Sequence, residues 1–64
     1  MNTILKNTRI KNGMTQLEVA KKSNISLMAY YRYEIGERTP NVHIAQRIAK
    51  VLNSTVEELF PLIE

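Results

Sequence analysis

Apolar residues recur every three to four positions along most of the chain, and no segment shows the strict alternation expected of a half-buried strand. Five such segments are separated by short polar turns, without an internal repeat. This pattern is typical of amphipathic helices that pack on a common core. We therefore predict an all-α fold of five helices, formed by a single domain over residues 1–64.

Capping and turn-forming residues mark the helix boundaries. Four expected N-caps are Thr15, Ser26, Asn41 and Thr55. Glu18 and Glu58 each stand three residues after a threonine cap, which is the pattern of a capping box. Gly13 and Gly36 are expected to end the first and third helices, and Asn24 lies in the turn between the second and third.

The second and fourth helices have clear apolar sides. The first is expected over about residues 3–12, and the second is expected to bury Leu17, Val19 and Ala20. The fourth carries a broad apolar stripe that we assign to the core. Its members are Val42, Ile44, Ala45, Ile48, Ala49, Val51 and Leu52.

The third helix, between Ser26 and Gly36, has apolar residues on two sides, so periodicity leaves its orientation open. One side carries Leu27, Met28, Tyr31, Arg32 and Ile35, and the other carries Ala29, Tyr30, Tyr33 and Glu34. The helical period favours burial of the first side. The tyrosines of the second side would then be half exposed.

The composition restricts the possible functions. A chain of 64 residues has one small core, which leaves little room for a substrate pocket and favours support from oligomerisation. There is no Cys, and His43 is the single His, so we expect neither a metal nor another cofactor. We find no nucleophile paired with a base and do not expect an enzyme. No apolar run of about 18 residues and no apolar leader is present, so we expect an intracellular protein without membrane contact.

Charge is distributed unevenly along the chain. The net charge is +3, but residues 1–50 hold all nine Lys and Arg against three Glu, which amounts to +6. Residues 51–64 hold three Glu and no basic residue, which amounts to −3. The N-terminal part is therefore suited to an anionic partner and the C-terminal end is not.

The segment from Thr15 to Pro40 has the shape of a helix-turn-helix. Two short helical patterns are joined by a turn of three to four residues and closed by a Gly-x-x-x-Pro loop that begins at Gly36. In such a unit the second helix lies in the major groove of DNA, with side chains near its N-terminus against the base edges. We expect this unit over about residues 15–36.

Several short matches along the chain point to a family. They are Leu5-Lys6, Arg9, Gly13-Met14-Thr15-Gln16, Val19-Ala20, Ile25-Ser26, Tyr33-Glu34-Ile35-Gly36, Arg38, Pro40, Ile48-Ala49-Lys50-Val51-Leu52 and Glu57-Glu58-Leu59-Phe60. Each match is weak alone, but their joint order and spacing are specific. Over nearly its whole length the chain resembles the phage repressor and Cro-type (XRE-like) helix-turn-helix family, a five-helix DNA-binding domain.

The resemblance assigns roles to individual residues. It implies that Tyr30 and Tyr33 face inward, that Arg9 and Glu34 form an ion pair, and that Asn24 stands where the turn usually has Gly. It implies base readout by Leu27, Met28, Tyr31 and Arg32. It implies phosphate contacts by Gln16 and Arg38, to which Lys11 and Lys21 add charge.

These observations predict a sequence-specific, double-stranded DNA-binding transcriptional regulator in the cytoplasm of a prokaryotic or phage-infected cell. We expect a homodimer on a two-fold operator, with the dimer contact at the acidic C-terminal end. The expected contact residues are Leu59, Phe60, Leu62 and Ile63. The alternative is a protein-interaction module, an antitoxin or adaptor, that docks a regulatory protein partner on the apolar side of the third helix.

Overall fold

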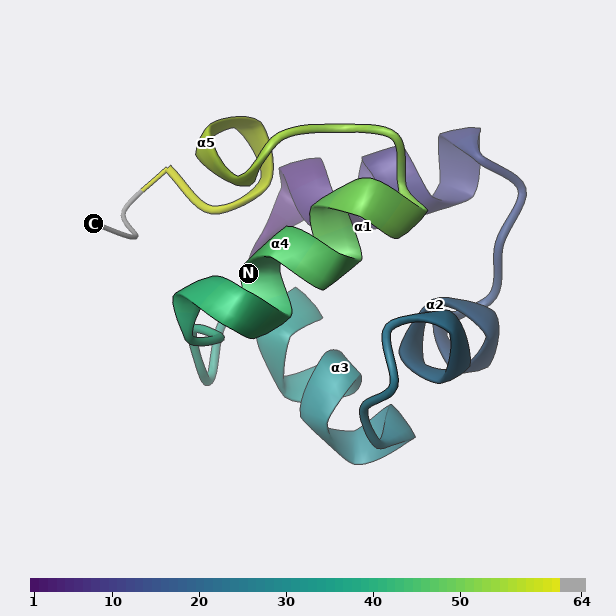
Figure 1. The fold of residues 1–64 in the computed structure, drawn as a ribbon, viewed down its shortest axis with the longest axis horizontal. Coiled ribbons are helices and arrows are strands. Elements are labelled where there is room, and N and C mark those ends of the chain that lie inside the picture. The colour runs from purple at the N-terminus through teal and green to yellow at the C-terminus, as the bar shows by residue number, and fades with distance from the viewer. Residues whose placement is uncertain (62–64) are drawn as a thin grey trace.

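The computed structural model describes residues 1–61. Over this range all regular structure is helical, and Figure 1 shows how the five helices are arranged. They are α1 (Thr3–Lys11), α2 (Gln16–Lys22), α3 (Leu27–Glu34), α4 (Val42–Val51) and α5 (Val56–Leu59). The prediction of an all-α fold of five helices is confirmed.

Each helix starts at a side chain that accepts a hydrogen bond from a backbone N–H of its first turn. These caps are Asn2, Thr15, Ser26, Asn41 and Thr55. The capping box of α2 is complete, because Glu18 accepts from the Thr15 N–H at 2.9 Å and Thr15 accepts from the Glu18 N–H at 3.1 Å. In α5 only half of the expected box forms, since the Glu58 carboxylate accepts from the Thr55 hydroxyl and not from its N–H.

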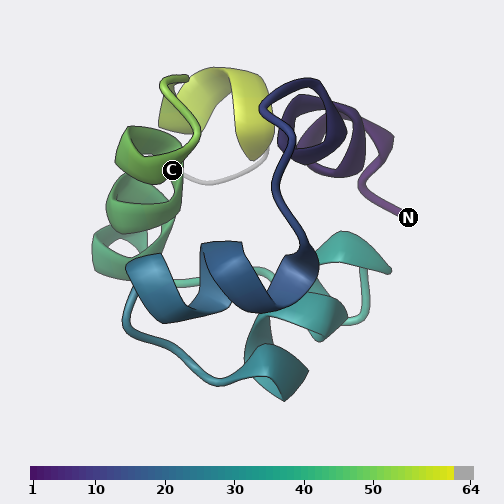
Figure 2. The ribbon, with the colours of Figure 1, turned by 90° about the vertical axis from the view of Figure 1, so that its right-hand side faces the viewer.

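Two pairs of helices and the single helix α4 build the domain. In Figure 2, α2 and α3 lie together at the bottom of the view, α1 and α5 lie at the top, and α4 runs along the left side. α2 packs against α3 and α4, α4 packs against α5, and α1 packs against α3 and α5. Within residues 1–61, no helix has the length and apolar character that a membrane span requires.

The core draws on all five helices. Its buried apolar members are Leu5, Val19, Ala20, Tyr30, Tyr33, Ala45, Ile48, Ala49, Leu52, Leu59 and Phe60. Two residues expected in the core are instead exposed, Leu17 by 45% and Val42 by 42%. Leu17 lies more than a quarter turn away from the buried side of α2, and Val42 is the first residue of α4, at the edge of the packed stripe.

The turn between α2 and α3 depends on one residue in the left-handed conformation. Asn24 has a φ of 58°. Its N–H donates to the carbonyl of Lys21 at 3.1 Å, and the N–H of Ile25 donates to the carbonyl of Ala20 at 3.0 Å, so the carbonyls at the end of α2 are satisfied. Asn is the non-glycine residue best able to adopt this conformation, which explains why the turn forms without Gly.

The N-terminal residues join the end of α3 to α5. The Asn2 N–H donates to the carbonyl of Glu34 at 2.9 Å, and its side-chain Nδ2 donates to the carbonyl of Leu59 at 2.6 Å. Gly36 follows α3 with a φ of 79°, and a Cβ at this position would lie 2.9 Å from the backbone nitrogen of Met1. A larger residue at position 36 would therefore displace the N-terminal segment.

A two-pronged ion pair joins α1 to α3. The Nε and Nη2 of Arg9 donate to the two carboxylate oxygens of Glu34 at 2.9 and 3.0 Å. The remaining Nη1 of Arg9 donates to the carbonyl of Met14 at 2.9 Å, which also fixes the segment between α1 and α2. The two side chains are 12% and 4% exposed, so the pair is shielded from water.

The surroundings of Glu34 keep its carboxylate ionised. Burial raises the pKa of Glu34, but hydrogen bonds from Arg9 and Gln16, the nearby Tyr30 hydroxyl and the charge of Arg9 outweigh burial and lower it below its ordinary value of 4.5. The buried Tyr30 hydroxyl has no partner in hydrogen-bonding geometry among the described residues, so it acts only as a neighbouring dipole. Its own pKa is raised by burial and by the Glu34 charge.

Replacing Glu34 by Gln should lower the free energy of unfolding by about 3 kcal/mol, because it leaves the Arg9 guanidinium shielded and unpaired. Glu37→Gln is the matched control, since Glu37 forms an exposed pair with Arg32 at 3.7 Å. That control should lose less than about 1 kcal/mol. Urea unfolding at neutral pH measures both. A loss below about 0.5 kcal/mol for Glu34→Gln would show that its pair is no stronger than a solvated one.

The stability difference between the native chain and Glu34→Gln should also depend on pH. The pKa of Glu34 is lowered in the folded state, so its contribution is complete above the ordinary value of 4.5 and disappears as the pH falls through the folded-state pKa. Urea unfolding of both proteins from neutral to acidic pH should show the two curves converging. A difference that stays constant over this range would mean that the ionised carboxylate is not its source.

Candidate nucleic-acid interface

α3 turns one side into the core and the other outward. Tyr30, Tyr33 and Glu34 are 0%, 8% and 3% exposed. On the opposite side, exposures of 44%, 56% and 43% belong to Leu27, Met28 and Tyr31. The orientation favoured by periodicity is therefore wrong, and the one implied by the family resemblance is confirmed.

Two physical causes set this orientation. Glu34 must face Arg9, and Tyr30 stands four residues earlier on the same side of the helix, so the ion pair carries Tyr30 inward as well. The two tyrosine rings also remove more apolar surface from water than Leu27 and Met28 would in their place. Ala20 of α2 is fully buried in the same core as the two tyrosines.

The N-terminal ends of α2 and α3 form a shallow depression on the surface. It is lined by Arg9, Gly13, Met14, Thr15, Gln16, Leu17 and Leu27. Leu17 therefore borders the outward side of α3, a place that its apolar character did not predict. Its angle on the helical wheel, nearly opposite Val19, is the signal in the sequence that indicates this position.

The basic residues expected to contact DNA lie on several elements. Arg32 lies on α3 with 40% of its side chain exposed, and it forms a weak pair with Glu37. Lys11, Lys21 and Arg38 are exposed, at the end of α1, on the last turn of α2 and in the loop after α3. These side chains are available to an anionic partner.

Gln16, the first residue of α2, differs from the basic candidates because a hydrogen bond already holds its side chain. Its Nε2 donates to the Oε1 of Glu34 at 3.2 Å, and the residue is only partly exposed. The ion pair, Gln16 and the capped end of α2 thus form one connected network. Sequence analysis singled out each residue of this network, but it did not predict the hydrogen bond between Gln16 and Glu34.

Among residues 1–61, no three His, Cys, Asp or Glu side chains come together as a possible ligand group. His43 is exposed on the first turn of α4, and we assign it no role.

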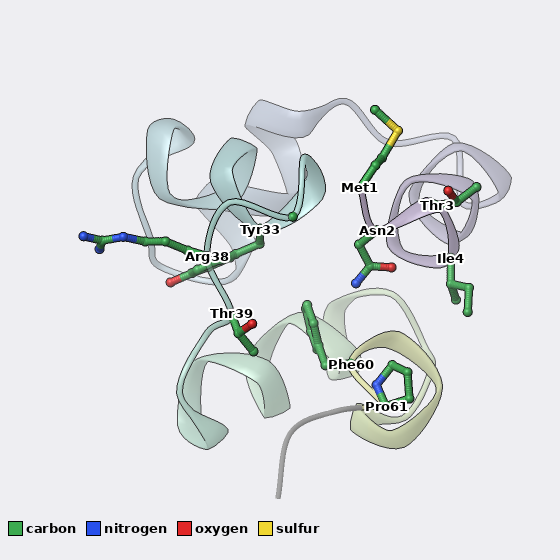
Figure 3. Close-up of a pocket in the computed structure, with 10 residues that line it drawn as sticks. Met1, Asn2, Thr3, Ile4, Tyr33, Arg38, Thr39, Phe60 and Pro61 are labelled. Carbon is green, nitrogen blue, oxygen red and sulfur yellow. The ribbon is translucent and has the colours of Figure 1, made fainter.

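An open groove of about 420 Å³ lies on another face, between the N-terminal residues, the loop after α3 and the end of α5. Figure 3 shows the Phe60 ring directed into the groove from below and the Arg38 side chain directed away from it. Two exposed apolar side chains border the groove from the N-terminal side, Met1 at 80% and Ile4 at 51%.

Two of the four residues expected at a dimer contact are buried within the single chain. Leu59 is fully buried and Phe60 is 5% exposed, because both pack into the core of a single chain. A second chain can therefore gain almost no apolar contact from them. Leu62 and Ile63, the other two expected contact residues, lie outside the described residues.

Comparisons with known proteins agree with this architecture. The helix-turn-helix family model matches residues 5–59. The chain belongs to this family. An uncharacterized HTH-type transcriptional regulator of Archaeoglobus fulgidus is 38% identical over 94% of the chain and 86% of its own length. Another, YqaF of Bacillus subtilis, is 38% identical over 81% of the chain and 68% of its own length, and no solved structure matches.

A third relative, an uncharacterized HTH-type transcriptional regulator of Methanothermobacter thermautotrophicus, is 31% identical over the whole chain and 94% of its own length. Membership of the helix-turn-helix family identifies the chain as a DNA-binding transcriptional regulator. Within this family the second helix of the unit is α3, so its outward side is the candidate interface with DNA.

Truncating the outward side of α3 should hardly affect stability. Leu27→Ala and Met28→Ala remove atoms that are already partly hydrated, so each should lower the free energy of unfolding by less than about 1 kcal/mol. Tyr30→Ala on the same helix empties a fully buried site and should cost about 3–5 kcal/mol. Urea unfolding compares the three. Equal losses would mean that the outward side is packed against the protein and is not a free surface.

Proposed function

We propose that this helix-turn-helix protein is a sequence-specific regulator that places the outward side of α3 in the major groove of double-stranded DNA. One observation carries the proposal: α3 exposes Leu27, Met28 and Tyr31 while its opposite side is fixed in the core. Contiguous apolar surface exposed on a soluble domain often marks a binding site.

The chemistry of the outward side suggests which bases are read. Leu27 and Met28 can contact the methyl group of thymine but offer no hydrogen bond. Arg32 can donate to O6 and N7 of guanine, and its exposed pair with Glu37 is weak enough to give way. Tyr31 can serve a base or a phosphate. Phosphate contacts by Gln16, Arg38, Lys11 and Lys21 would position the complex without reading sequence.

The regulator would bind as a homodimer on a two-fold operator in the prokaryotic cytoplasm, where such a regulator meets DNA. Extents of 27 × 21 × 20 Å allow two copies side by side to place equivalent α3 helices roughly 34 Å apart, which is one turn of the duplex. The acidic end of the chain, which includes α5, would face away from DNA. The groove bordered by Met1 and Ile4 provides exposed apolar surface for the contact.

Selection of bound sequences from a random duplex pool tests the proposal. Enrichment of an inverted repeat supports both specificity and the dimer. The alternative, a module that docks a protein partner, is favoured by the apolar character of α3 together with the exposed Leu17. A salt titration separates the two, because DNA binding should weaken strongly with salt. Absence of duplex binding at low salt would favour the docking module.

Replacing Arg32 by Ala and replacing Arg38 by Ala should change DNA binding in different ways. Loss of Arg32 should weaken binding to the best selected site by about 1–3 kcal/mol and relax the preference at one guanine. Loss of Arg38 should weaken binding to all sequences alike and reduce the slope of log affinity against log salt by about one unit. Fluorescence anisotropy on matched and mutated sites measures both. The same behaviour for the two variants would refute the division between readout and positioning.

The dimer contact can be tested on α1, where two isoleucines are similarly exposed. Ile4, 51% exposed, borders the groove, whereas Ile10, 55% exposed, does not. Ile4→Asp should convert a dimer to a monomer in sedimentation equilibrium, because a charge would be buried in the contact. Ile10→Asp is the control and should leave the assembly unchanged. A dimer that survives Ile4→Asp would place the contact elsewhere.

A further inference from the structure

Gln16 and Arg9 share one carboxylate oxygen. The Oε1 of Glu34 accepts hydrogen bonds from the Nη2 of Arg9 at 3.0 Å and from the Nε2 of Gln16 at 3.2 Å. An ionised carboxylate can only accept hydrogen bonds, so it selects the nitrogen end of the Gln16 amide and excludes the oxygen end. The orientation of this amide is therefore set by Glu34 and not by chance.

Glu34 is itself held in place from two sides. Its carboxylate forms the two-pronged pair with Arg9, and its backbone carbonyl accepts from the N–H of Asn2. Only 4% of its side chain is exposed. Gln16, in contrast, is partly exposed at the rim of the depression that Leu17 and Leu27 border. The buried carboxylate of Glu34 thus holds, through one hydrogen bond, an amide that lies at the protein surface.

The amide nitrogen of Gln16 carries two hydrogens, and Glu34 uses one of them. We propose that Glu34 is a positioning residue for DNA binding: it orients the Gln16 amide so that the second N–H donates to a phosphate of the duplex. This inference rests on the proposed function. A side chain oriented in advance loses less conformational freedom when DNA arrives, which strengthens the contact without adding a new one.

A double-mutant cycle tests the coupling. The variants are Gln16→Met, which keeps the length of the side chain and removes the amide, Glu34→Gln, and both together. Their affinities for a random-sequence duplex of about 20 base pairs, which spans two half-sites, are measured at low salt and at a temperature at which every variant is folded. Gln46→Met, which removes the only other glutamine, is the control and should bind like the native chain.

Gln16→Met should weaken binding about tenfold, the expected effect of losing a hydrogen bond to a charged group. Its salt slope should be unchanged, because a neutral amide displaces no counterion. Glu34→Gln should weaken binding severalfold in the native background and less than about twofold in the Gln16→Met background. The same factor in both backgrounds would show that Glu34 acts only through the fold, and would overturn the proposal.

A second measurement uses only the native chain, in case Glu34→Gln does not fold. The side-chain amide signals of Gln16 and Gln46 are resolved by nitrogen NMR and assigned from the two Met variants. Addition of the duplex should shift the Gln16 signals and leave those of Gln46 in place. If backbone signals of α3 shift while the Gln16 signals do not, the positioning proposal is wrong and DNA binding stands. If no signal shifts at low salt, DNA binding itself is wrong.

Discussion

The ion pair between Arg9 and Glu34 is the interaction on which the rest of the domain depends. It links α1 to the end of α3, and its third nitrogen ties down the segment that leads into α2. Because both side chains are shielded from water, neither can lose its partner without leaving an uncompensated charge. The pair therefore constrains not only the distance between two helices but also the rotation of α3 about its own axis.

That rotation decides which side chains are free. With Glu34 fixed inward, Tyr30 and Tyr33 enter the core, and Leu27, Met28 and Tyr31 remain at the surface. A rotation of half a turn would hide the apolar stripe and expose two tyrosines and a carboxylate, which suits an anionic partner poorly. The same constraint that stabilises a small core thus presents the surface proposed to read DNA.

The surface and the core are connected at Gln16, where a partly exposed amide meets the buried carboxylate. The opposite end of the domain has a different character, with acidic residues on α5 and an open groove beside the N-terminal segment. This segregation of charge suits a protein that meets DNA on one side and a second copy of itself on another. In a chain of 64 residues, both surfaces have to be built from the same five helices.

The five helices follow from local signals in the sequence. The caps Thr15, Ser26 and Asn41 and the left-handed positions at Gly13, Asn24 and Gly36 each act on their own segment of the chain. The resemblance to the helix-turn-helix family also predicted the ion pair between Arg9 and Glu34. The tertiary structure decided the exposure of Leu17 and Val42, the burial of Leu59 and Phe60 within one chain, and the role of Asn2. It also decided the bond from Gln16 to Glu34. These features depend on contacts between distant segments, and the apolar pattern of one helix carries no information about which neighbour will cover it.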